Sequence, residues 1–129
     1  MRSAWLAVVG VFVAGFWLGG RVAYTQQSLD PLVVDPQHYH LEFENEFVKV
    51  IRCHIGPHEK VAMHHHPVGS VILFVTDQNL KQSAPDGTSS EAHHKAGEVL
   101  WAEPTTHLGE NYTDKPYEYV RVDIKAAER

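Results

Sequence analysis

The chain has little cysteine and little basic charge, and each shortage excludes one class of structure or partner. Cys53 is the single cysteine, so the chain cannot form an internal disulfide. Its flanks, VKVIRCHI, favour a β-strand, and we expect a small buried side chain rather than a catalytic thiolate, which needs an accessible electropositive setting. The 129 residues carry 11 Lys and Arg against 16 Asp and Glu. We therefore expect no nucleic-acid partner, because such a partner requires a basic face.

Helical periodicity is also missing after residue 23, where the chain shows short β-like stretches separated by turn residues. Pro85-Asp86-Gly87 is a strong hairpin signal between two of them. About eight such stretches, in a chain long enough for one domain, predict an all-β antiparallel sandwich or barrel. The clearest stretches are residues 38–44, 46–55, 70–77 and 117–124.

Two of these stretches carry expectations about the faces of their strands. Residues 38–44 alternate, which places Tyr39, Leu41 and Phe43 on one face of a strand. Residues 70–77 form a nearly continuous apolar run, so we expect that strand to be buried on both faces.

The N-terminal segment has no charge in residues 4–20, which lie between Arg2 and Arg21 and have no polar face. This apolar run is near the lower limit for a membrane span and slightly long for the apolar region of a cleaved signal. Residues 1–23 are therefore interpreted as an apolar helix that serves either as a signal peptide or as a membrane anchor. In both cases we expect the remainder outside the cytoplasm, periplasmic or secreted, and held at the membrane if the segment is uncleaved.

Residues 24–37 mix polar residues with two Asp-Pro steps, Asp30-Pro31 and Asp35-Pro36. Asp-Pro disfavours helix and favours a turn or extended backbone. We therefore expect a linker that leads into a domain of residues 38–129.

Histidine is concentrated at residues 64–66, within VAMHHHPVGSVILFV. On a strand, His64 and His66 point to one face with α-carbons about 6.5–7 Å apart, while His65 points to the other. The two rings can share one metal ion with bonds of about 2.0–2.1 Å. Because two ligands rarely make a protein metal site, a third is needed, and His107 is the best candidate.

The pattern around these histidines resembles the first motif of small single-domain cupins, a jelly-roll β-barrel family. That motif has a glycine, five residues, His-x-His, three or four residues and a glutamate. In this chain Gly56 is followed after seven residues by His64-x-His66. The glutamate is absent, since Ser70 and Val71 occupy its two positions.

The family's second motif is also matched in part, with its Pro-x-Gly portion altered. Its matching residues follow in order as Gly97, Pro104, His107 and Asn111. The resemblance covers residues 40–124 and implies a jelly-roll barrel. It carries over His64, His66 and His107 as metal ligands, without the carboxylate ligand that many cupins add. Cupins often pair, so a homodimer is an open alternative.

Three neutral imidazoles would leave a divalent ion its full charge and an open coordination face. Such a site favours a small anionic or chelating molecule and suits Zn, Fe, Mn, Cu or Ni. Because the rings must be deprotonated to bind, we expect metal affinity to fall as the pH drops through about 6.5. The alternative is an incidental, solvent-facing histidine tract.

Other side chains carry weaker expectations. His93 and His94 face opposite sides of a predicted strand, and one of them could supply a fourth ligand; the alternative is a surface position or support of the metal ligands. Glu103 and Glu110 could act as an acid or base at the pocket mouth or be solvated loop carboxylates. We expect surface positions for His38, His40, His54 and His58, and core or pocket-wall positions for Phe74 and Trp101.

Three functions fit this sequence. The first is a metal-dependent enzyme, of oxygenase or isomerase type, that acts on a small anionic molecule. The second is a non-catalytic module that binds a metal or small ligand. The third is a structural, dimer-forming cupin without metal. The missing carboxylate and the lack of a convincing general acid or base leave the first only slightly favoured.

Overall fold

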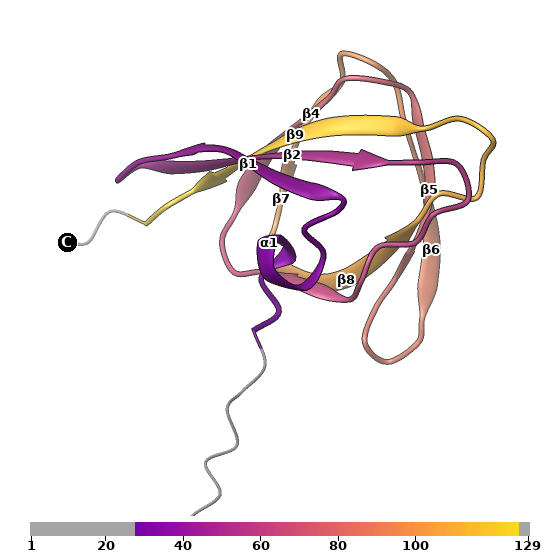
Figure 1. The fold of residues 1–129 in the computed structure, drawn as a ribbon, viewed down its shortest axis with the longest axis horizontal. Helices are drawn as coiled ribbons and strands as arrows, with labels where there is room; N and C mark the ends of the chain where they lie inside the picture. The colour runs from indigo at the N-terminus through magenta and orange to yellow at the C-terminus, as the bar shows by residue number, and fades with distance from the viewer. Residues whose placement is uncertain (1–27, 127–129) are drawn as a thin grey trace, which may run out of the picture.

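The short strands pair into two antiparallel sheets in the computed structural model, which describes residues 28–126 (Figure 1). The larger sheet has the order β1-β2-β9-β4-β7 and the smaller one β3-β8-β5-β6. The strands within the described residues are β1 (Tyr39–Glu44), β2 (Val48–Ile55), β3 (His64–His66), β4 (Ser70–Phe74), β5 (Gln78–Ser83), β6 (Ser89–His94), β7 (Val99–Ala102), β8 (Thr105–Glu110) and β9 (Tyr117–Ile124). The all-β expectation is confirmed, with one short helix, α1 (Pro31–Val34), before β1.

The central strand β9 shows how the barrel interior is built. It pairs with β2 on one side and β4 on the other. Because side chains alternate across a strand, every second residue of β9 is buried, and these are Tyr117, Tyr119, Arg121 and Asp123. Two of these four are charged, so the interior of the barrel is not a purely apolar core.

Several sequence-based expectations are confirmed by the strands. The turn around Gly87 has the positive φ of 87° that favours glycine, and it joins β5 to β6. Cys53 is fully buried in β2, and burial raises its pKa to about 12. The thiol therefore remains protonated, and its role is packing.

The turn or extended backbone expected at Asp30-Pro31, within the predicted linker of residues 24–37, is wrong. Pro31–Val34 form helix α1, and the side chain of Asp30 accepts a hydrogen bond of 2.9 Å from the amide of Leu32. Proline is compatible with the first helical position, where no amide donor is needed, and aspartate is a favourable N-cap. The Asp-Pro step therefore begins a helix here.

Two further expectations are also wrong. A bulge between Leu41 and Phe43 breaks the alternation of β1, so Phe43 does not share one face with Tyr39 and Leu41. In the run 70–77, Leu73 is exposed. That run is therefore not buried on both faces, because the sheet has an open outer surface that carries large apolar side chains.

The predicted signal or anchor segment, residues 1–23, lies outside the described residues. Among residues 28–126, no helix has the length and apolar character needed to cross a membrane.

Asn111, the last residue of the second motif, links the end of β2 to the turn before β9 through its side-chain hydrogen bonds. It is fully buried, and its Nδ2 donates to the carbonyl oxygens of Gly56 and Lys115 at 2.9 and 2.8 Å. Its Oδ1 accepts from the amide and hydroxyl of Thr113 at 3.0 and 2.9 Å. The motif residue thus holds the end of β2 against the turn that precedes β9.

Replacement of Asn111 by alanine should lower the free energy of unfolding by about 2–4 kcal/mol, because it leaves several buried polar groups without partners. Chemical denaturation of Asn111→Ala measures the change. Asn79→Ala is the control, since Asn79 is exposed and makes one side-chain bond to His93. Equal stability of the two variants would contradict this role.

Candidate metal centre

The pairing of β3 with β8 brings the three predicted ligands together. His64 lies directly opposite His107 in the antiparallel register, and directly opposed side chains share a face. Alternation then places His66 on that same interior face, where His64 and His66 are 0% and 1% exposed. His65 points outward and its Nδ1 bonds to the hydroxyl of Thr106 at 2.8 Å.

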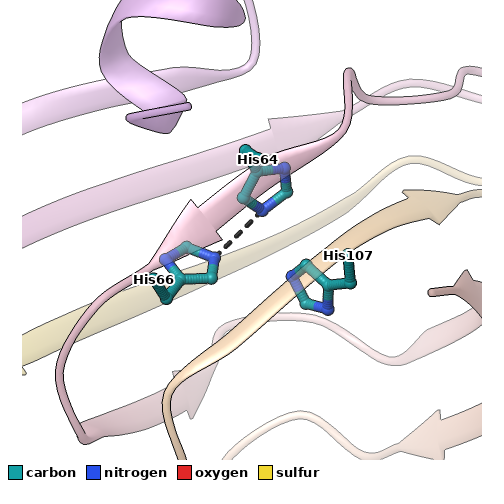
Figure 2. Close-up of side chains that lie close together, drawn as sticks. All are labelled: His64, His66 and His107. Atoms are coloured by element: carbon teal, nitrogen blue, oxygen red, sulfur yellow. Dashed lines mark hydrogen bonds between the residues drawn. The ribbon is translucent and has the colours of Figure 1, made fainter. Parts of the chain in front are cut away.

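The three rings converge closely enough to hold one ion (Figure 2). One nitrogen from each ring lies within 4.8 Å of the others. The ring centroids of His64 and His66 are 4.7 Å apart, and those of His64 and His107 are 4.8 Å apart. The Nε2 atoms of His64 and His66 are separated by 2.9 Å. Two nitrogens bound to one ion at about 2.0–2.1 Å would be about 2.9–3.4 Å apart, so this pair already fits.

The hydrogen bonds around His64 select the tautomer that a metal requires. Its Nδ1 donates to the carbonyl oxygen of Ala62 at 2.7 Å, since a carbonyl only accepts. The Nε2 atom of the neutral ring is then unprotonated and accepts from the hydroxyl of Tyr39 at 3.2 Å. Backbone anchoring of the far nitrogen is the usual way to orient a metal-binding histidine.

Burial keeps all three rings neutral. It lowers the pKa values of His64 and His66 and lowers the pKa of His107 to about 4, with nearby Arg121 adding to each shift. The neutral imidazole is the form that binds metal. Protons therefore compete with a metal ion for these nitrogens only well below pH 6.5, the approximate pKa of an exposed imidazole. The expected fall in metal affinity accordingly moves to a lower pH.

Arg121 is the interior residue that sequence reasoning missed. It is 2% exposed, and its Nε donates to Asp123 Oδ1 at 2.7 Å. Ser70, at one of the two positions where the motif glutamate is absent, also donates to Asp123 Oδ1, at 2.6 Å. The signal was available in YEYVRVDI, because its alternation puts Arg121 on the same face as Tyr117 and Tyr119.

A cavity of about 380 Å³ opens beside His107. Its wall includes polar side chains from both sheets, among them Tyr39, Gln78, Arg121 and His107. This volume suits a small molecule. A larger hollow of about 640 Å³ reaches His66 from the side of α1, where the ion pair of Lys49 with Asp30 lies.

The remaining histidines lie outside the three-ring cluster. His94 stacks on Phe74 with ring centroids 4.1 Å apart and bonds to Glu98, and it is not part of the three-ring cluster. The surface expectation is confirmed for His40, His54 and His58. It is wrong for His38, which is buried between Asp35 and Glu59 at 2.7 and 3.0 Å.

The core or pocket-wall position expected for Phe74 is confirmed, whereas the one expected for Trp101 is wrong. Phe74 is buried in the core, as expected. Trp101 is 54% exposed on β7 and donates to Glu103 Oε1 at 2.8 Å, so it packs neither in the core nor in the cavity wall. Glu103 lines the cavity but is exposed.

Comparison with known proteins agrees with the fold. No family profile and no curated protein matches the chain. A cupin domain from Bordetella pertussis Tohama I is 26% identical, with a TM-score of 0.64 over 68% of this chain and 92% of that one. An uncharacterized conserved protein with a double-stranded β-helix domain from Klebsiella pneumoniae subsp. pneumoniae MGH 78578 is 24% identical, with a TM-score of 0.54 over 67% and 74%.

An RmlC-like cupin family protein from Methanocaldococcus jannaschii has the same double-stranded β-helix fold. It is 11% identical, with a TM-score of 0.53 over 67% of this chain and 77% of that one. The described residues therefore adopt the cupin jelly roll, with three histidines gathered in its interior.

The metal-free protein should lose stability as the pH falls from about 6.5 to about 4. Over this range the unfolded chain binds protons on its histidines, whereas burial keeps His64, His66 and His107 unprotonated in the folded chain. Protonation thus favours unfolding. Urea denaturation in a chelator, at pH values on either side of this range, measures the loss.

The variant His107→Leu separates this effect from the titration of carboxylates. It removes one of the shifted rings and should lose less stability over the same pH range than the wild type. An equal loss of stability in both proteins would show that His107 does not contribute to the pH dependence of unfolding.

Proposed function

We propose that this cupin binds one divalent transition-metal ion through His64, His66 and His107 and acts as a metal-dependent enzyme on a small anionic molecule. The single observation that carries the proposal is the convergence of three neutral imidazoles, two fully buried and one partly buried, on one point of the barrel interior. A surface histidine tract would be solvated. These rings have instead been moved out of water, which costs free energy unless they have partners.

The donor set fits Zn, Fe, Cu or Ni, since imidazole nitrogen suits each of these ions, while Mn, the fifth candidate, prefers oxygen ligands. Once bound, the ion would supply a Lewis-acid or oxygen-binding centre. The contribution of the chain itself is to orient the ligand His64. Ala62 fixes the ring of His64, and the hydroxyl of Tyr39 lies at its Nε2. Burial raises the pKa of Tyr39 well above its usual range, so this hydroxyl is suited to donate a hydrogen bond rather than to act as a base.

A non-catalytic ligand-binding module is the second candidate, and one observation favours it. Asp123 is the buried carboxylate on the inner face of β9, and its Oδ1 already accepts hydrogen bonds from Arg121 and Ser70. Glu103 lines the cavity from an exposed position. Of the other titratable side chains in the cavity wall, His94 bonds to Glu98 and stacks on Phe74, so a general base would have to come from this engaged ring, the ligand or metal-bound solvent.

The proposed location is extracytoplasmic, and it rests on the apolar residues 4–20. Pairing of two copies is compatible with the apolar side chains that are exposed on the outer face of the larger sheet, including Leu73, Val99 and Trp101.

Metal analysis of untagged protein should find one ion per chain, and the variants His64→Ala and His107→Ala should lose affinity by more than about 100-fold. Even residues that only support metal ligands typically contribute roughly 10–100-fold. Calorimetric titration with Zn²⁺ measures the affinities.

His65→Ala is the matched control for this titration, because His65 lies between two of the ligands and points outward. It should bind as the wild type does. A similar loss in His65→Ala, or retention of the ion in His107→Ala, would exclude the three-histidine site.

Catalysis is tested by dioxygen uptake and by turnover of small carboxylic acids and sugars, with protein reconstituted with each of the five metals. We expect turnover that needs one particular metal and disappears in His107→Ala. Tight metal binding without turnover on any substrate would instead support the non-catalytic module.

A further inference from the structure

Two buried polar atoms at the cavity lack any hydrogen-bond partner, and among residues 28–126 they are the only such side-chain atoms. They are Nη2 of Arg121 and Oε1 of Gln78. The two side chains are 2% and 3% exposed. They come from different sheets, on β9 and β5, yet both line the cavity beside His107.

We infer that Arg121 and Gln78 form a recognition site for a small carboxylate that also carries a hydroxyl or amino group. This inference rests on the proposed function, because the ligand would lie beside the three-histidine site. The guanidinium would bind the carboxylate through Nη2, and the amide oxygen of Gln78 would accept from the second group.

The state of Arg121 supports this assignment. Its Nε is already committed to Asp123 Oδ1, which fixes the guanidinium plane and leaves other donors for a ligand. Ser70 donates to the same carboxylate oxygen, so Asp123 is itself held in place by a second strand of the sheet. A guanidinium that is fixed in this way presents its donors without further ordering, which is a condition for selective binding.

The charge balance of the interior also favours an anion. Arg121 and Asp123 compensate each other, and the three rings of the metal centre are neutral. A divalent ion would then give this side of the barrel an uncompensated positive charge. A ligand carboxylate would balance part of that charge and at the same time provide the missing acceptor for Arg121.

Gln78 adds specificity for a second group on the ligand. A carboxylate offers only acceptors, so it cannot satisfy Oε1 of Gln78, which needs a donor. A hydroxyl or an amine next to the carboxylate supplies one. A neutral amide or a simple alcohol would offer Nη2 of Arg121 no charged acceptor.

The probes are glycolate, its neutral analogue glycolamide, and acetate, which lacks the hydroxyl. Binding is measured by calorimetry or NMR, in a buffer free of carboxylates, to both the Zn²⁺-loaded and the metal-free protein. We expect the wild type to bind glycolate at least about tenfold more tightly than glycolamide and more tightly than acetate, as a charge-assisted hydrogen bond implies.

The test variant is Arg121→Gln/Asp123→Asn, which removes both charges of the pair together and so avoids a buried unpaired carboxylate. In the metal-free form, where no bound cation attracts the carboxylate, it should bind glycolate and glycolamide within about twofold of each other. In the same form, Gln78→Leu should keep the preference for carboxylate over amide but lose the preference for glycolate over acetate. Arg52→Gln is the control, since Arg52 is a surface residue paired with Glu42 and Glu118.

The outcomes separate this inference from the proposed function. If the metal-free wild type shows no preference for carboxylate, or if metal-free Arg121→Gln/Asp123→Asn keeps it, the recognition site is wrong even when one Zn²⁺ binds. If no Zn²⁺ binds, the proposed function fails, and the same preference in the metal-free protein still decides whether Arg121 recognises carboxylates.

Discussion

The site depends on the register between two short strands, β3 and β8. A pairing that puts His64 opposite His107 places both rings on the interior face, and alternation adds His66 to them. A shift of one residue would turn all of β3 over and send His64 and His66 to the surface. Hydrogen bonds outside the strand pair help to fix this register, including the amide of Val61 to Gly109 and that of Asn111 to Glu59 at 2.9 Å each.

The interior of this barrel combines a packed core with a polar wall. Ile51, Ile55 and Leu80 belong to the apolar cluster, while β9 contributes charged residues to the same interior. Burial has opposite consequences for the two kinds of residue. It stabilises the apolar side chains, and it keeps the histidines neutral by penalising their protonated form. The same exclusion of water that stabilises the fold thus keeps the three imidazoles in the neutral form that can bind a metal ion.

Much of the fold could be predicted from sequence, because turn residues and alternating apolar residues act locally. The stretch 117–124 coincides with β9, and the Pro85-Asp86-Gly87 signal gave the hairpin. The approach of His107 to His64 is not local, and it was predicted only through the resemblance to cupin motifs. The bulge in β1 and the burial of His38 could not be predicted, because each depends on tertiary partners: the pairing with β2, and Glu59.

X-ray absorption spectroscopy of the Zn²⁺-loaded protein tests the central claim most directly, because it reports the atoms around the ion. The account predicts three imidazole nitrogens at about 2.0–2.1 Å, completed by oxygen ligands, in the wild type. A spectrum with no more than one imidazole, or one that is unchanged when His64 and His107 are both replaced by alanine, would contradict it.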